Sequence, residues 1–215
     1  IIFDRDVEEI GNSAFKYCPN LASITIPDGV TSIGESAFNG CSSLASVTIP
    51  DSVTKIKNYA FAGCSSLKSV IIGNGVTSIG DDAFLRCSSL TSVTIPDSVT
   101  SIGKSAVDGC SGLTEVTIGN GVTSIGYSAF RGCSSLTSIT IPDSVTWIGS
   151  YAFEDCSSLT SVYCKATTPP TGGWGMFDYN ASGRKIYVPT ESVNAYKSAE
   201  GWSNDKSYIY DYDFE

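Results

Sequence analysis

The sequence predicts a repeat solenoid, a fold in which one short structural unit stacks on copies of itself. Three files of equivalent residues recur with a period of 23. They are a cysteine file (Cys18, Cys41, Cys64, Cys87, Cys110, Cys133, Cys156), a leucine file (Leu21, Leu44, Leu67, Leu90, Leu113, Leu136, Leu159) and an isoleucine file (Ile10, Ile33, Ile56, Ile79, Ile102, Ile125, Ile148). Because the three files stay in register, the period organises the chain as far as Cys164.

Each unit is predicted to contain a short strand, a corner, a second extended piece and a turn that carries an aromatic ring. In one unit Val93 and Ile95 alternate with Thr94, so the two apolar side chains should point inward and the threonine outward. Proline or glycine then ends the strand. The segment 35–40 is too short for a stable helix, and we expect a helical or 3₁₀ turn that places Phe38 in the core.

These units divide the chain into two predicted parts. Residues 1–164 should form about seven stacked coils of short parallel strands joined by extended and 3₁₀ turns, with the first coil incomplete. Ile1-Ile2-Phe3 aligns with a strand, so the first coil should have an open edge through which chains could self-associate. After Cys164 the period is lost, and residues 165–215 are predicted to form a small α/β cap. Its last strand is expected at Lys185–Pro189, followed by a short helix that Thr190 caps and that runs to about Ala199.

Composition excludes several classes of function. The net charge of −9 argues against a nucleic-acid partner. The chain has no histidine, which removes the usual general base and zinc ligand, and no cofactor is expected. It also has no apolar run of the ~18 residues that a membrane-spanning helix needs, so we expect no direct insertion into a membrane.

Two repeated polar files could carry chemistry. Equivalent cysteines on adjacent coils should lie ~4.8 Å apart with parallel side chains, which is too far for a disulfide, so all eight thiols, Cys164 included, are expected to be free and mostly buried. A second file (Asp28, Asp51, Asp97 and Asp143, interleaved with Asn74 and Asn120) lies at one corner. These side chains could bind calcium, but bonds to their own local backbone explain them more simply.

Binding would have to use the exposed surface. One candidate set is the outward file of the strands, namely Thr48, Ile71, Thr94, Thr117, Thr140 and Tyr163. The alternative is that threonine is simply a good strand residue and that stacked hydroxyls satisfy one another. A second set lies beside the Ala-Phe turn and in the second extended piece. It comprises Tyr127, Arg131, Trp147 and Tyr151, residue types that interface hot spots use. Trp147 and Tyr151 are the preferred pair, although packing against the cap would explain them equally well.

The motif Ile-Gly-x-x-Ala-Phe-x-x-Cys-x-x-Leu-x-x-Val-x-Ile-Pro resembles the BspA-like leucine-rich repeat family of bacterial surface proteins. The resemblance covers residues 1–164 and implies a solenoid of the leucine-rich-repeat type. It also implies a cell-surface or secreted location and adhesion to a protein or glycan, including host extracellular matrix. A repeat fold by itself does not determine a ligand.

The sequence therefore predicts a non-catalytic binding or adhesion module that uses its exposed solenoid face. The main alternative is a structural spacer or self-assembling repeat that presents another domain. A hydrolase built on a Ser-Lys or carboxylate pair is a remote third hypothesis.

Overall fold

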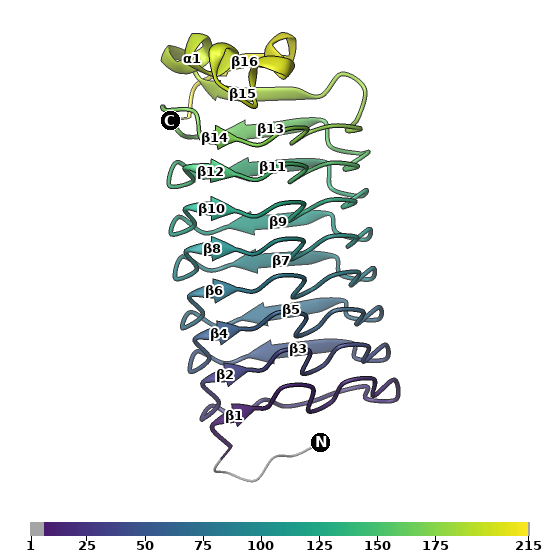
Figure 1. The fold of residues 1–215 in the computed structure, drawn as a ribbon. Coiled ribbons are helices and arrows are strands. Elements are labelled where there is room, and N and C mark those ends of the chain that lie inside the picture. The colour runs from purple at the N-terminus through teal and green to yellow at the C-terminus, as the bar shows by residue number, and fades with distance from the viewer. Residues whose placement is uncertain (1–6, 215) are drawn as a thin grey trace.

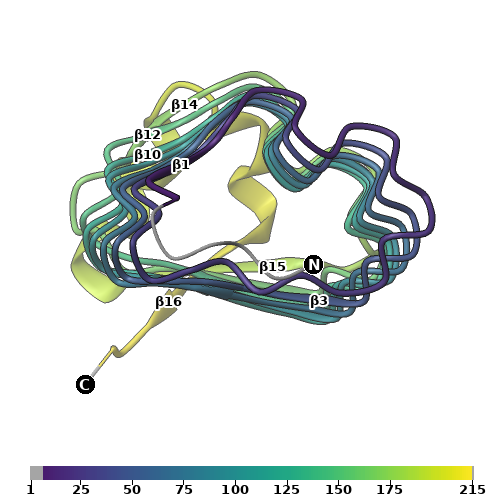
Figure 2. The same cartoon turned by 90° about the horizontal axis from the view of Figure 1, so that it is seen from below.

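The structure is a computed structural model, and it describes residues 7–214. The chain winds into one stack of coils with walls of parallel strands along its length (Figure 1). Seen along the stack, the coils superpose around a common apolar interior (Figure 2). The predicted solenoid of stacked parallel strands is confirmed.

One wall is an eight-stranded sheet of two-residue strands. Its members, in spatial order, are β1 (Glu9–Ile10), β2 (Ser32–Ile33), β4 (Lys55–Ile56), β6 (Ser78–Ile79), β8 (Ser101–Ile102), β10 (Ser124–Ile125), β12 (Trp147–Ile148) and β14 (Thr171–Gly172). Each strand pairs with its equivalent in the next coil, as Ile33 does with Ile56. The isoleucine file is therefore a ladder of buried side chains along the inside of this wall.

The opposite wall contains the longer strands. One four-stranded sheet comprises β3 (Ser46–Ile49), β5 (Ser69–Ile72), β7 (Ser92–Ile95) and β9 (Glu115–Ile118), and a second comprises β11 (Ser138–Ile141), β13 (Ser161–Cys164), β15 (Lys185–Pro189) and β16 (Ile209–Tyr212). In β7, Val93 and Ile95 are buried and Thr94 is exposed, as the alternation predicts. We call the outer surface of these two sheets the strand face.

The segment that carries the aromatic ring differs in detail from the predicted helical or 3₁₀ turn. In the second coil, Ala37 N–H donates to Gly34 O and Asn39 N–H to Ser36 O, whereas Ser36 N–H donates to Asn58 O in the next coil. Ser36 has a positive φ of 56°. Because alternate amides pair with the neighbouring coil, the segment is a run of β-turns that extends the stack's hydrogen bonding, and it still buries Phe38 completely.

Two ladders fill the core beside this segment. Phenylalanine rings stack from coil to coil, and the centroids of Phe38 and Phe61 lie 5.1 Å apart. All eight cysteines are free. The thiol of Cys64 donates to Phe38 O across 3.3 Å, and its burial raises its pKa to about 12. The cysteines are therefore small core residues, and the six of the file from Cys41 to Cys156 each donate to a backbone carbonyl. Cys18, in the first described coil, is less buried than the others.

Strand pairing continues past Cys164, where the sequence period is lost. β14 and β15 each extend a wall, and Phe177 stacks on Phe153 at 5.5 Å. Asn180 Nδ2 donates to Phe153 O at 2.7 Å, the equivalent of the bond from Cys156 Sγ to Phe130 O. The expectation that β15 is the last strand is wrong, because β16 pairs with it in parallel. The division into residues 1–164 and 165–215 stays a prediction about the sequence repeat.

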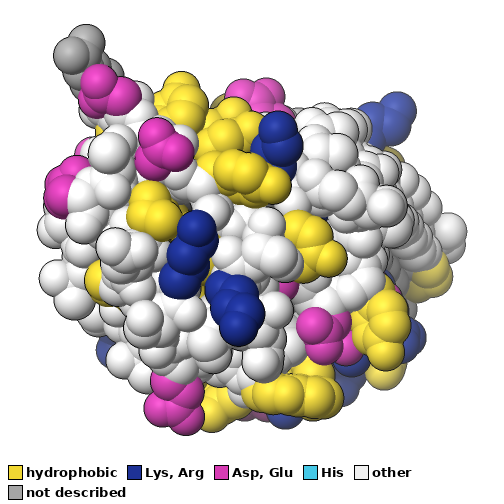
Figure 3. Space-filling model, turned by 90° about the horizontal axis from the view of Figure 1, so that it is seen from above, with side chains coloured by type: hydrophobic (Ala, Val, Ile, Leu, Met, Phe, Trp, Pro, Cys, Tyr) yellow, Lys and Arg dark blue, Asp and Glu magenta, His cyan; other side chains and the backbone are white. Residues whose placement is uncertain are grey.

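Short helices close the C-terminal end of the stack, where Figure 3 shows a surface of mixed polar, charged and apolar side chains. They are the 3₁₀ helix Thr190–Ser192, α1 (Val193–Ser198) and the 3₁₀ helix Ser203–Tyr208. Thr190 does not cap a helix, because its backbone already lies in the first of them and no side-chain cap bond forms. Instead Tyr196 Oη donates to Ala166 O and Trp202 Nε1 to Pro170 O, with both rings fully buried.

Two remaining expectations concern the surroundings of the stack. Ile1-Ile2-Phe3, the proposed open edge, lies outside the described residues. Within residues 7–214, no helix has the length and apolar character that crossing a membrane would require.

Candidate binding surface

The outward file predicted from the sequence forms a line along the strand face that crosses from the first four-stranded sheet to the second. Thr48 pairs with Ile71, Thr94 with Thr117, and Thr140 with Tyr163 in parallel register. All lie at outward positions, and Ile71, the one aliphatic residue of this set, is 61% exposed. The file therefore brings its members together as neighbours on one surface.

The hydroxyls of this file are not used by the fold. Within residues 7–214, no side-chain hydrogen bond engages Thr48, Thr94, Thr117 or Thr140, nor the serines beside them on the strands. Elsewhere the fold does use threonine: Thr77 Oγ1 donates to Thr54 O at 3.1 Å, and Thr100 Oγ1 to Thr77 O at 3.2 Å. The idea that stacked hydroxyls on the strand face satisfy one another therefore finds no support, and their donors and acceptors face solvent.

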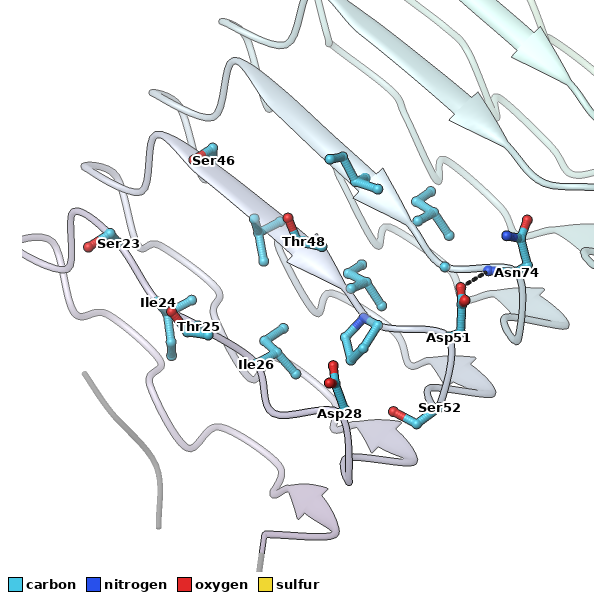
Figure 4. A pocket seen from close by; sticks show the side chains of 16 residues that line it. Ser23, Ile24, Thr25, Ile26, Asp28, Ser46, Thr48, Asp51, Ser52 and Asn74 are labelled. Atoms are coloured by element: carbon cyan, nitrogen blue, oxygen red, sulfur yellow. Dashed lines mark hydrogen bonds between the residues drawn. The ribbon is translucent and has the colours of Figure 1, made fainter. Parts of the chain in front are cut away.

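A groove of about 800 Å³ lies over the N-terminal half of the strand face. Thr25, Thr48 and Ile71 are among its lining residues. Asp28, Asp51, Ser52 and Asn74 line it at one corner (Figure 4). The groove thus combines free hydroxyls, one exposed aliphatic side chain and a carboxylate edge. This mixture can hold a polar partner and bury a small apolar contact.

The Asp/Asn corner is built from bonds between coils, which corrects the expectation of local backbone caps. Asp51 Oδ1 accepts from the backbone N–H of Asn74 at 2.7 Å, while Ser52 Oγ donates back to Val30 O at 2.7 Å. Asp97 makes the equivalent bond to Asn120. Among the described residues, no group of three or more acidic or cysteine side chains is arranged to hold a metal ion. The carboxylates of Asp51 and Asp97 therefore tie successive coils together.

The three aromatic residues of the second candidate set lie near the opposite wall, where two of them pair with each other and the third pairs with Trp174. Tyr127 meets Trp147 edge-on at 5.4 Å, and Tyr151 meets Trp174 edge-on at 5.3 Å. Trp147 and Tyr151, the preferred pair, thus pack on different partners. Sequence reasoning missed Trp174, which is 63% exposed, because it follows the loss of the period.

Arg131 has an internal role that the sequence did not reveal. Its guanidinium donates to the Asp108 carboxylate, with Nη2 and Oδ2 2.9 Å apart. That hydrogen bond raises the pKa of Arg131 further above its already high value. Because Asp108 is mostly buried, much of the arginine's charge is committed to this pair rather than to a partner.

A third aromatic group lies at the C-terminal end of the strand face, and of its members the sequence analysis had singled out only Tyr163. Tyr163 stacks on Tyr187 at 4.9 Å, and Tyr212 meets both rings edge-on. The sequence gives a weak signal for it, since three tyrosines lie in the last eight residues, but nothing before the fold places β16 beside β15.

Comparison with known families decides the relationship. The model of the BspA type leucine rich repeat region matches in six copies over residues 1–114 and 77–199. The chain belongs to this BspA-type family. Its short parallel strands, phenylalanine ladder and thiol–carbonyl bonds are the physical form of that repeat here.

Solved structures agree with this assignment. A leucine-rich repeat protein from Bacteroides ovatus is 34% identical with a TM-score of 0.75, over 86% of this chain and 48% of that one. A T. pallidum leucine rich repeat protein is 29% identical with a TM-score of 0.71, over 84% and 86%. A leucine rich cell surface protein from Faecalibacterium prausnitzii is 27% identical with a TM-score of 0.56, over 89% and 65%.

The BspA-type chain spans about half the length of the Bacteroides ovatus protein. No protein with a curated description matches it.

Proposed function

We propose that this BspA-type chain is a non-catalytic binding or adhesion module at a cell surface or in secreted form, and that it recognises a protein or glycan through the strand face. The observation that carries the proposal is the contrast between threonine files. The Thr54–Thr77–Thr100 hydroxyls bond to the stack, whereas those of Thr48, Thr94 and Thr117 are left to solvent. A free, evenly spaced row of donors and acceptors suits recognition of an extended partner.

Two further features support the proposal. Ile71 places an exposed aliphatic group among the hydroxyls, in the lining of a groove large enough for a peptide or sugar segment. The Faecalibacterium prausnitzii relative is described as a cell surface protein, which supports the proposed location.

One observation favours the alternative function of a structural spacer or self-assembling repeat: the strands of each wall repeat from coil to coil along the stack. This alternative predicts concentration-dependent self-association and no saturable partner, so sedimentation of the purified chain separates the two functions. A binding module should remain monomeric at concentrations at which it saturates with a partner.

The test of the proposed function is binding of the purified chain to a panel of extracellular-matrix proteins and glycans. Ile71→Thr makes the outward file threonine from Thr48 to Thr140 and preserves a β-branched strand residue, so the fold should be unchanged. We expect it to weaken the strongest saturable interaction about fivefold, because it removes one small apolar contact. Affinity is measured by surface-immobilised titration.

The matched control is Tyr17→Asn, which removes an exposed ring away from the strand face at a position with a positive φ that asparagine tolerates. This variant should bind as the parent chain does. A panel without any saturable partner, or equal losses in both variants, would contradict the proposal.

A further inference from the structure

The strand face changes character at its C-terminal end. The register of β13, β15 and β16 aligns Tyr163 with Tyr187 and Tyr187 with Tyr210, so tyrosine replaces threonine in the outward file. The Tyr163 and Tyr187 rings stack at 4.9 Å. Tyr212 crosses them, with its centroid 5.2 Å from Tyr163 and 5.5 Å from Tyr187. We call Tyr163, Tyr187, Tyr210, Tyr212 and Phe214 the tyrosine cluster.

A hollow of about 320 Å³ opens at this cluster. It is lined by Thr140, Tyr163, Lys165, Tyr212, Asp213 and Phe214. Its volume lies at the lower end of the ~300–1,000 Å³ typical of small-ligand sites. Rings form part of its wall, and a hydroxyl, an ammonium and a carboxylate stand beside them.

The cluster is distinct from the rings that close the stack. Trp202 and Tyr196 are fully buried and bond to backbone carbonyls, and they seal the apolar interior. Tyr212, which lines the hollow, keeps 42% of its surface exposed on the outer side of the sheet. Rings that remain this exposed at a hollow leave contact area available to a ligand.

The lining selects a ligand class. Aromatic faces pack against the C–H faces of a sugar ring, while tyrosine, threonine, lysine and aspartate side chains can pair with its hydroxyls. Lys165 and Asp213 carry opposite charges, so the side chains that line the hollow have no excess of either sign that would select an anionic or a cationic ligand. A neutral ligand with an apolar face and a hydroxylated rim fits this lining.

We propose that the tyrosine cluster binds a neutral saccharide, with one sugar ring seated against Tyr163 and Tyr212. This inference rests on the proposed function, because the cluster is the C-terminal end of the strand face. It adds the ligand class and the place of its primary contact. The free hydroxyls of Thr140 and Thr117 continue the surface along which a longer glycan would run.

The experiment uses the full chain and immobilised neutral oligosaccharides containing glucose, galactose, mannose or N-acetylglucosamine, with sialylated and sulfated oligosaccharides alongside. Tyr212→Ala should weaken binding to the neutral probe about tenfold, because it removes one stacking ring. Tyr212→Phe keeps the ring and should stay within about threefold of the parent chain. Tyr179→Asn removes a 74% exposed ring at a position with a positive φ outside the cluster and should bind normally. Thermal unfolding followed by circular dichroism verifies that each variant is folded.

Each outcome is decisive for the saccharide site. The site is supported if the chain binds a neutral saccharide, and if Tyr212→Ala weakens that binding while Tyr212→Phe retains it. Three results would overturn the saccharide site: binding to anionic saccharides alone, no binding to any saccharide, or an affinity for the neutral saccharide that Tyr212→Ala leaves unchanged. If the saccharides fail while a panel protein binds in an Ile71-dependent manner, this inference falls and the proposed function stands. If no protein or glycan binds at all, both fall.

Discussion

Replacing Phe61 with alanine is expected to lower the free energy of unfolding by about 3–5 kcal/mol. Phe61 is fully buried and its ring stacks between Phe38, at 5.1 Å, and Phe84, at 5.4 Å. The substitution leaves a cavity in the middle of the ladder and separates the rings on either side. Urea unfolding followed by circular dichroism measures the change.

The control for this prediction is Phe84→Ala, at the equivalent position of the next coil. Phe84 is as deeply buried, but Val107 follows it in the file, so the ladder stacks on one side of its ring. We expect Phe84→Ala to be less destabilising than Phe61→Ala by the ~0.5–1.5 kcal/mol that a ring pair contributes. Equal losses would show that stacking between coils adds nothing beyond burial.

Gly75→Ala is expected to destabilise the stack by about 3 kcal/mol, at the upper end of overpacking costs. A Cβ at Gly75 would lie 1.8 Å from the backbone oxygen of Asp51, so the two coils would have to move apart. That movement also strains the bond between Asp51 and the N–H of Asn74. The measurement is again urea unfolding.

Ser98→Ala is the matched control, because Ser98 occupies the same place in the next coil and already carries a Cβ, so the substitution removes only the bond from Ser98 Oγ to Val76 O. It should lower the free energy of unfolding by about 1 kcal/mol. If the two alanine variants unfold alike, coil spacing is not fixed at this corner.

The corner shows how far the sequence could predict the structure. The period established the coil, its inward residues and the outward file, because each is repeated many times. The replacement of Pro-Asp-Ser by Gly-Asn-Gly in alternate coils was visible but unexplained. Its cause is the close approach of Gly73 and Gly75 to the backbone of Pro50 and Asp51, which only the stacked coils reveal.

The C-terminal part was harder to predict, because the coils continue there while the residues that mark the repeat in the sequence are replaced by others. Gly172 takes the strand position of Ile148, and Asn180 donates the bond that Cys156 donates one coil earlier. Neither substitution resembles the repeat in sequence. The tyrosine cluster was missed for the same reason, since it depends on the pairing of β16 with β15.

The most direct test of the account is whether binding occurs on the strand face. Thr94→Arg places a long charged side chain on the strand face. Thr100→Arg places the same side chain in the same coil, directly before β8 of the opposite wall. For the strongest partner found in the panel, we predict at least about a tenfold loss of affinity for Thr94→Arg and less than about a twofold change for Thr100→Arg. Equal affinities in the two variants, or a loss confined to Thr100→Arg, would contradict the claim that the free hydroxyl row is the recognition surface.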